Sequence, residues 1–256
     1  MRNDEESFPV DHTPSSSGSW ADYPKGVVWA MLERGLKPSG MYAVLSSDVP
    51  VGAGMSSSAA VEVAFGYAWQ QLSDFSLALP QLALLCQRAE NEYVGVNCGI
   101  MDQMISACGK AGHAMMLDTR SLERSYFPLP EGIAIIVADS LVRRSLSGSE
   151  YNVRRAQCEE AVSILQQHYP EVKALRDVTL EQLEQHRHEL PETVYRRARH
   201  VVTENARVLM LARALQQGRL EEVGHLLVEG HRSLRDDYEV SIPELDTLVE
   251  AATEVE

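Results

Sequence analysis

Apolar positions along this chain follow helical spacing more often than the alternation of strands. Residues 57–72 show this well: the expected buried face carries Val61, Ala64, Phe65, Ala68, Trp69 and Leu72. The same three- and four-residue spacing predicts helices at residues 22–35, 80–93, 151–168, 192–217, 219–235 and 242–256, and a short one containing Asp102. Helices are therefore expected to dominate, above all in the second half.

Four shorter runs have the composition of strands, with β-branched or aromatic residues between turn-forming neighbours. They are residues 41–47 (MYAVLSS), 113–119 (HAMMLDT), 124–129 (RSYFPL) and 132–139 (GIAIIVAD). Strands and helices thus alternate in the first part, and helices alone fill the second. This order predicts an α+β fold.

The chain divides into three regions by composition. Residues 1–19 are polar, end in TPSSSGS, and are expected to form a disordered or poorly anchored lead-in. Residues 20–145 are expected to form an α/β domain, and residues 146–256 a mainly helical part. The last predicted helix has neither a glycine cap nor a closing strand, so we expect the sequence to be cut there.

The stretch SSDVPVGAGMSSSAAVEVAFGYAWQQL, residues 46–72, joins a glycine- and serine-rich loop to a helix. The first turn of a helix exposes unpaired N–H groups, and Gly52 and Gly54 allow close backbone approach, so the junction is suited to an anion such as phosphate. It lacks the lysine of a Walker motif. A plain serine cap on a core helix explains the same residues equally well.

Composition narrows the possible partners. The 256 residues include 23 basic and 37 acidic ones, a formal net charge of −14, which disfavours a nucleic-acid partner. The longest apolar stretches are too short to span a membrane, and the N-terminus lacks the apolar segment of a signal peptide. We therefore expect a cytoplasmic protein without a membrane partner.

The cysteines and histidines do not form a recognisable metal motif. Cys86, Cys98, Cys108 and Cys158 are spaced too irregularly for zinc and too sparsely for a disulfide scaffold, so reduced, packed thiols are expected. The histidines, which include His186, His188 and His200, are interpreted as surface or packing residues.

Three segments carry a resemblance to a known family when they are taken together. They are the loop at residues 46–72, AENEYVGVNCGIMDQMIS at 89–106 and GSEYNVRRAQCEEA at 148–161. In this order they closely resemble the galactokinases, sugar kinases of the superfamily shared with homoserine, mevalonate and phosphomevalonate kinases. The likeness extends over nearly the whole chain from Trp20. It implies a two-lobed small-molecule kinase fold.

The resemblance implies an ATP site and a catalytic base. The ATP phosphates would lie against Gly52, Ala53, Gly54, Met55, Ser56, Ser57 and Ser58, with Trp20 and Tyr23 on the adenine side. Ser58 and Glu90 match the family's magnesium ligands, and Asp102 matches the aspartate that takes a proton from the sugar C1 hydroxyl. Without the resemblance, Glu90 would be interpreted as a solvated acid, Asp102 as a capping or surface residue, and Trp20 as a core residue.

The resemblance also implies the substrates. Gly99, Asp102 and Tyr151 match positions that contact galactose, and the expected reaction is ATP-dependent formation of α-D-galactose 1-phosphate by a monomer with Mg²⁺. The family's sugar-gripping segment, similar to GRVNLIGEHTDY, and its C-terminal glycine-rich loop have no match here. We therefore expect an internal fragment with impaired activity. An N-acetylgalactosamine kinase and a non-catalytic galactose and ATP sensor remain alternatives.

Overall fold

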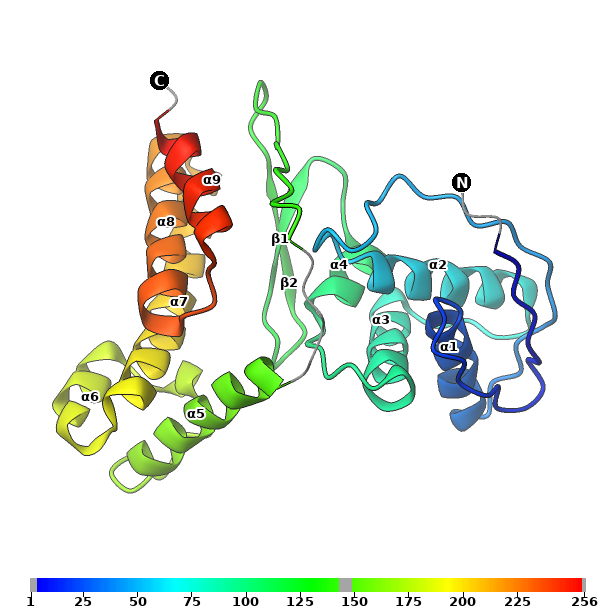
Figure 1. Cartoon of the computed structure of the whole chain (residues 1–256), viewed down its shortest axis with the longest axis horizontal. Coiled ribbons are helices and arrows are strands. Elements are labelled where there is room, and N and C mark those ends of the chain that lie inside the picture. The colour runs from blue at the N-terminus through cyan, green and yellow to red at the C-terminus, as the bar shows by residue number, and fades with distance from the viewer. Residues whose placement is uncertain (1–3, 143–148, 255–256) are drawn as a thin grey trace. The chain divides into compact units, whose positions relative to one another are not determined.

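The structure, a computed structural model, describes residues 4–142 and 149–254, and for residues 149–151 the backbone alone. The chain forms two compact units, Met1–Tyr126 and Phe127–Glu256, each with its own core (Figure 1). The predicted boundary between residues 145 and 146 lies outside the described residues and stays a prediction.

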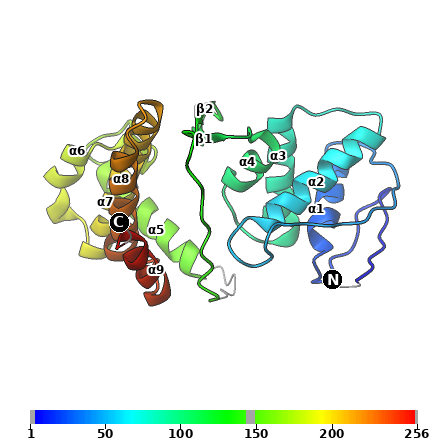
Figure 2. The ribbon, with the colours of Figure 1, turned by 90° about the horizontal axis from the view of Figure 1, so that it is seen from above.

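Unit one is a helical cluster with a small hairpin at its end. Its elements are α1 (Asp22–Glu33), α2 (Ser57–Leu72), α3 (Leu79–Arg88), the π-helical turn η1 (Ala89–Val94), α4 (Met101–Cys108), β1 (His113–Leu117) and β2 (Arg124–Pro128). The strands β1 and β2 pair as a two-stranded sheet. Helix α2 crosses α1 and lies beside α3 (Figure 2). These elements confirm the predicted helices and two of the four predicted strands.

The buried face of α2 differs from the predicted one. Ala64 and Leu72 are exposed, whereas Glu62 and Gln70 are buried together with Gly66. The cause is close helix packing, since a Cβ added at Gly66 would lie 2.8 Å from Leu82 Cδ1. A helix that packs on three neighbours buries a wider and rotated stripe than apolar spacing alone predicts.

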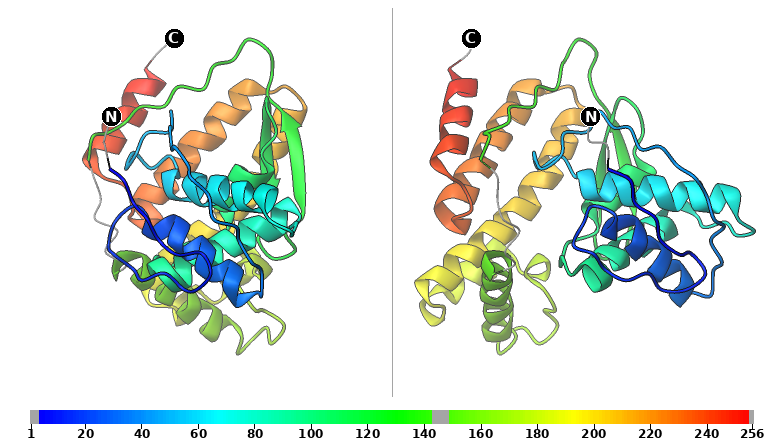
Figure 3. Two further views of the ribbon diagram at one scale, coloured as in Figure 1. Left: turned by 90° about the vertical axis from the view of Figure 1, so that its right-hand side faces the viewer. Right: turned by 45° about the vertical axis from the view of Figure 1, so that its right-hand side comes forward.

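The two other predicted strands, at residues 41–47 and 132–139, are not strands in the structure. A long trace without helix or strand leads from α1 to α2 (Figure 3). Tyr42, Val44, Ile135 and Ile136 are between 75% and 108% exposed. A strand forms only when a neighbouring strand accepts its hydrogen bonds, and among the described residues neither segment has such a neighbour. The prediction of strands was therefore wrong here.

The polar lead-in makes specific contacts with the start of α1. The buried carboxylate of Asp22 accepts hydrogen bonds from the Ser16 hydroxyl at 2.7 Å, the Ser17 N–H at 2.9 Å and the Gly18 N–H at 2.7 Å. Burial raises the pKa of Asp22, but these hydrogen bonds outweigh it and lower the pKa to about 2. Lys25 Nζ donates to the Ser17 hydroxyl at 2.7 Å. Residues 16–18 are thus held against α1.

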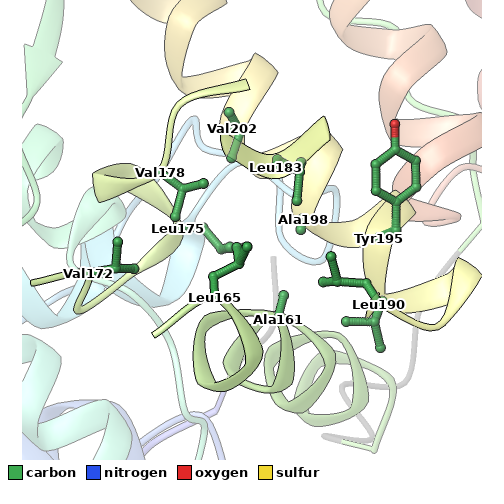
Figure 4. Close-up of a cluster of buried hydrophobic side chains, with 11 residues drawn as sticks. Ala161, Leu165, Val172, Leu175, Val178, Leu183, Leu190, Tyr195, Ala198 and Val202 are labelled. Carbon is green, nitrogen blue, oxygen red and sulfur yellow. The ribbon is translucent and has the colours of Figure 1, made fainter. Parts of the chain in front are cut away.

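Unit two is mainly helical from Ser149 onward, and its described residues 129–142 form neither helix nor strand. Its elements are α5 (Ser149–Leu165), η2 (Leu175–Asp177), α6 (Leu180–Gln185), η3 (Arg187–Glu189), α7 (Glu192–Gln216), α8 (Leu220–Ser233), η4 (Leu234–Tyr238) and α9 (Pro243–Thr253). Its core joins α5, the segment after it, α6 and α7 (Figure 4). Every helix in the described residues is too short or too polar to cross a lipid bilayer. The helices predicted at 151–168, 192–217, 219–235 and 242–256 are confirmed.

Candidate active site

The predicted anion-binding loop ends at the N-terminus of α2 in a left-handed backbone. Gly52 and Gly54 both have φ near +72°, and Ser56, directly before α2, has φ 57°. Glycine adopts such angles at little cost, which explains the two glycines of VGAGM. The Ser56 side chain does not cap the helix, so the first turn keeps its N–H groups for another partner. The local geometry is that of an anion-binding helix terminus.

Helix α2 links this loop to a buried polar cluster. Ser58 is the second residue of α2 and is half-buried, and Glu62 lies one turn further along the same face. Glu62 is 0% exposed although it is the only charged residue of the helix. A buried carboxyl group requires polar partners, because its transfer out of water is costly.

Gln103 supplies those partners and joins three elements. Its Nε2 donates to Glu90 Oε2 of η1 at 2.5 Å and to Glu62 Oε2 of α2 at 3.2 Å. Gln103 itself belongs to α4 and is 0% exposed, and Glu90 is 5% exposed. The Cys98 thiol also donates to Glu90 Oε2, at 3.3 Å. One amide therefore fixes α2, η1 and α4 relative to one another.

The cluster keeps one of its carboxyl groups protonated near neutral pH. Burial, and next the nearby charge of Glu90, raise the pKa of Glu62 to about 9. Burial together with Glu90 also raises the pKa of the Cys98 thiol to about 12. Two buried carboxylates so close together would repel each other. The raised pKa of Glu62 avoids that repulsion, because the protonated carboxyl group is neutral.

Asp102 lies directly before Gln103, in the first turn of α4, with a half-buried side chain. Its backbone position is thus fixed by the amide that holds Glu62 and Glu90. Gly99, in the loop before α4, is exposed, and a Cβ placed there would meet no atom within 4 Å. The backbone at Gly99 is therefore open to close approach by another molecule.

The predicted aromatic residues are distributed differently. Tyr23 of α1 lies near the cluster: burial, and next the charges of Glu90 and Glu62, raise its pKa. Trp20 is half-buried just before α1, and its carbonyl accepts the Tyr23 N–H at 3.4 Å. Tyr151 falls in the first turn of α5, in unit two, and its side chain lies outside the described residues.

The cluster offers oxygen atoms of the type that Mg²⁺ prefers. Glu62 Oε1 and Gln103 Oε1 are buried without a hydrogen-bond partner, and Glu90 adds a carboxylate beside them. Hard divalent cations bind carboxylate, amide and hydroxyl oxygens, and the Ser58 hydroxyl lies one helical turn from Glu62. The donor set fits a magnesium ion near Glu90 and Ser58.

Glu62 and Gln103 were not predicted as site residues from the sequence. Two signals were available: Glu62 is the single charge within AAVEVAFGYAW, and it lies four residues after Ser58. Gln103 carried no comparable signal, because its importance comes from two partners that are 13 and 41 positions away in the sequence.

Comparison with known proteins finds a family model, related sequences and a related structure that agree with one another. Residues 22–110 match the family model of the GHMP kinases N terminal domain. A galactokinase of Roseiflexus sp. (strain RS-1) is 49% identical over 98% of this chain, and one of Chloroflexus aggregans (strain MD-66 / DSM 9485) is 50% identical over 97%. The crystal structure of Lactococcus lactis galactokinase complexed with galactose superposes with a TM-score of 0.82 at 30% identity, over 96% of this chain.

The chain is shorter than these relatives. It spans 64% of the length of the two curated galactokinases and 64% of the Lactococcus lactis chain. The likeness in sequence and in structure covers both compact units, since it extends over almost all of the 256 residues.

Proposed function

We propose that this chain, whose residues 22–110 match the family model of the GHMP kinases N terminal domain, carries the ATP site and catalytic base of a galactokinase. The reaction is transfer of the γ-phosphoryl group of ATP to the C1 hydroxyl of D-galactose, which gives α-D-galactose 1-phosphate and ADP. The observation that carries this proposal is the identity of about half of all positions with galactokinases over 97–98% of the chain.

The phosphates of ATP bind at the loop Gly52–Ser58 and the start of α2. The left-handed angles of Gly52 and Gly54 turn the chain toward the ligand, and the free first-turn N–H groups donate to phosphate oxygens. The loop members Ala53, Met55, Ser56 and Ser57 contribute backbone groups or hydroxyls, and Trp20 borders the adenine. The positive end of the α2 dipole adds to the attraction for the phosphate charge.

Ser58 and Glu90 hold Mg²⁺ in this proposal. The bound ion supplies positive charge that neutralises the phosphates during transfer. The protein's part is to hold the Glu90 carboxyl group in position. The Gln103 amide does this, because its Nε2 donates to Glu90 Oε2 and to Glu62 Oε2 and so ties η1 to α2.

Asp102 accepts the proton of the C1 hydroxyl as that oxygen attacks the γ-phosphorus. Gly99 lets the sugar approach closely, and Tyr151 contacts it through its phenol. Phosphoryl transfer requires mainly positioning and charge neutralisation, so one carboxylate near the nucleophile is sufficient as the base. We propose a monomer, with ATP drawn from the cytoplasm.

The experiment compares products rather than binding. The chain is extended to the length of its relatives, incubated with ATP, Mg²⁺ and either galactose or N-acetylgalactosamine, and the sugar phosphate is identified by ³¹P NMR. We expect α-galactose 1-phosphate from galactose and at least about tenfold slower turnover of the acetylated sugar. Faster phosphorylation of N-acetylgalactosamine, or nucleotide binding without any sugar phosphate, would overturn the assignment.

A further inference from the structure

Two histidines and a glutamate that have no role in the proposed kinase site meet in unit two. His168 follows α5, His186 ends α6, and Glu189 belongs to η3. His168 Nε2 lies 2.7 Å from Glu189 Oε2, and His186 Nδ1 lies 2.8 Å from Glu189 Oε1. One ligand atom from each of the three residues lies within 4.8 Å of the others.

We propose that His168, His186 and Glu189 bind a divalent transition-metal ion of the zinc type. Two imidazoles and one carboxylate are a donor set that zinc accepts, with solvent in the fourth position. Hard cations such as Mg²⁺ prefer oxygen ligands, so they are poor candidates for this site.

The present distances require only a small adjustment. Ligand bonds of about 2.1 Å in a tetrahedral site place neighbouring donor atoms roughly 3.4 Å apart. The two nitrogen-to-oxygen distances, 2.7 and 2.8 Å, must therefore open by about 0.6–0.7 Å. The two rings stack with centroids 3.8 Å apart, so one must turn for both nitrogens to face the ion. His168 is the more exposed of the two, at 35%, and has room to turn.

His186 also has a hydrogen-bond partner that would orient its ring. Its other ring nitrogen, Nε2, lies 3.3 Å from the hydroxyl of Tyr169. When a metal occupies Nδ1, the ring proton moves to Nε2 and is donated to the Tyr169 oxygen. Tyr169 then donates its own proton to Gln185 Oε1, 3.4 Å away. Metal-bound histidines in proteins have this arrangement, in which the distal N–H is hydrogen-bonded.

The site is open to solvent, because the side chain of Glu189 is 30% exposed. An ion would reach the three side chains without unfolding of the core that α5, α6 and α7 share.

Bound metal would join the segment after α5 to the turn between α6 and α7. These pieces of chain flank the core formed by Leu165, Val172, Leu175, Leu183 and Leu190. A ligand that binds only the folded chain raises its stability. The site is therefore expected to act as a structural clamp on unit two.

The test uses the 256-residue chain, freed of metal with EDTA and titrated with ZnCl₂ by calorimetry, with thermal unfolding measured in parallel. We expect one saturable site and a rise in Tm. His168→Gln, His186→Gln and Glu189→Gln should each abolish saturable binding. Tyr169→Phe should weaken it by about tenfold or more through loss of the hydrogen bond to His186. His188→Gln is the matched control, because His188 is 78% exposed beside Glu189 and is not a ligand.

Each variant is first shown to unfold cooperatively without metal, and the three ligand positions provide independent tests if one variant is unstable. Saturable binding that is lost in the three ligand variants and kept in His188→Gln supports the site. Absence of saturable binding, or equal affinity in the ligand variants and the control, overturns it and leaves a hydrogen-bonded triad. The result is independent of the kinase assignment, since no nucleotide or sugar is present.

Discussion

In unit one, the buried side chains of Glu62, Gln103 and Glu90 form a hydrogen-bonded bridge with Gln103 in the middle. Glu62 and Gln103 are 0% exposed, Glu90 is 5% exposed, and one amide group serves both carboxyls. Buried polar groups are costly unless their hydrogen bonds are satisfied, yet Glu62 Oε1 and Gln103 Oε1 have no partner. Such unsatisfied oxygens beside the Glu90 carboxyl group agree with the proposal that a cation binds here.

The raised pKa of Glu62 makes the stability of the chain depend on pH. Between the ordinary value of 4.5 and the folded value of about 9, the folded chain holds the Glu62 proton more tightly than the unfolded chain does. This contribution to stability is therefore fully present below pH 4.5 and is lost as the pH rises toward 9. Its slope is at most about 1.4 kcal/mol per pH unit.

Glu62→Gln keeps the shape and removes the titration. We expect the free energy of unfolding of the variant to fall less steeply than that of the natural chain between pH 5 and pH 9. Urea unfolding at several pH values, without divalent ions, measures both slopes. Parallel curves for the two proteins would show that Glu62 is already ionised in the folded chain.

Asp102 is expected to act in the reaction and not in folding. In the chain extended to the length of its relatives, Asp102→Asn should lower kcat by ~10² or more and leave the affinity for ATP nearly unchanged, because general-base assistance contributes about that much. Asparagine has nearly the same size and shape as aspartate, so the half-buried position 102 accommodates either side chain. Steady-state kinetics decide: near-normal kcat in the variant would mean that Asp102 is a capping residue.

At the scale of elements, helix packing in unit one depends on a close approach of α2 to α3. Gly66 of α2 faces Leu82 of α3 without room for a methyl group. Gly66→Ala should therefore destabilise unit one by about 1–3 kcal/mol, as overpacking of a core does. Gly224 of α8 is the control, since a Cβ there meets no atom within 4 Å.

Gly224→Ala is expected to stabilise the chain by about 0.5–1 kcal/mol through helix propensity alone. Chemical denaturation of both variants gives the comparison. If Gly66→Ala leaves the stability of unit one unchanged, α2 and α3 move apart easily enough to admit a methyl group.

The elements that were predicted well from the sequence are those that form through interactions between residues close together in the chain. Helices α1, α5, α7, α8 and α9 follow from spacing and from stop signals such as Gly35, which has φ +71°. The hairpin β1–β2 also follows, because its strands are adjacent in sequence. The segments 41–47 and 132–139 were predicted as strands from composition, but a strand depends on a partner that composition does not reveal.

The same limit applies to the site. The loop Gly52–Ser58 was predicted because glycines, serines and a helix start are consecutive in the sequence. The partner of Glu90 was not, because Glu62 and Gln103 meet it only after α2, η1 and α4 pack together. The placement of Glu90 in a π-helical turn was equally unpredictable, although such turns are frequent at functional sites.

At the scale of the whole molecule, the two strand-like segments leave a large apolar surface in contact with water. Ile135 and Ile136 are 75% and 88% exposed, and Tyr42 and Val44 are almost fully exposed. Extended, apolar segments without a strand partner promote association between chains. The chain is therefore expected to aggregate at concentrations at which compact domains of similar size stay monomeric.

A charge in the middle of residues 132–139 should reduce this association. We expect Ile136→Lys to raise the concentration at which light scattering begins, with no loss of thermal stability, because Ile136 contacts little of the folded chain. Ile136→Val keeps the apolar character and serves as the control. Equal scattering by both variants would show that another surface causes the association.

The most direct test of the account is magnesium-dependent binding of ATP by the 256-residue chain. Calorimetry with ATP, at several Mg²⁺ concentrations, should show one site whose affinity rises with Mg²⁺. Ser58→Ala and Glu90→Gln should remove most of that dependence, whereas Gly224→Ala should keep it. ATP binding with the same dependence on Mg²⁺ in all four proteins, or no binding by any of them, would contradict the assignment of the loop Gly52–Ser58 and Glu90.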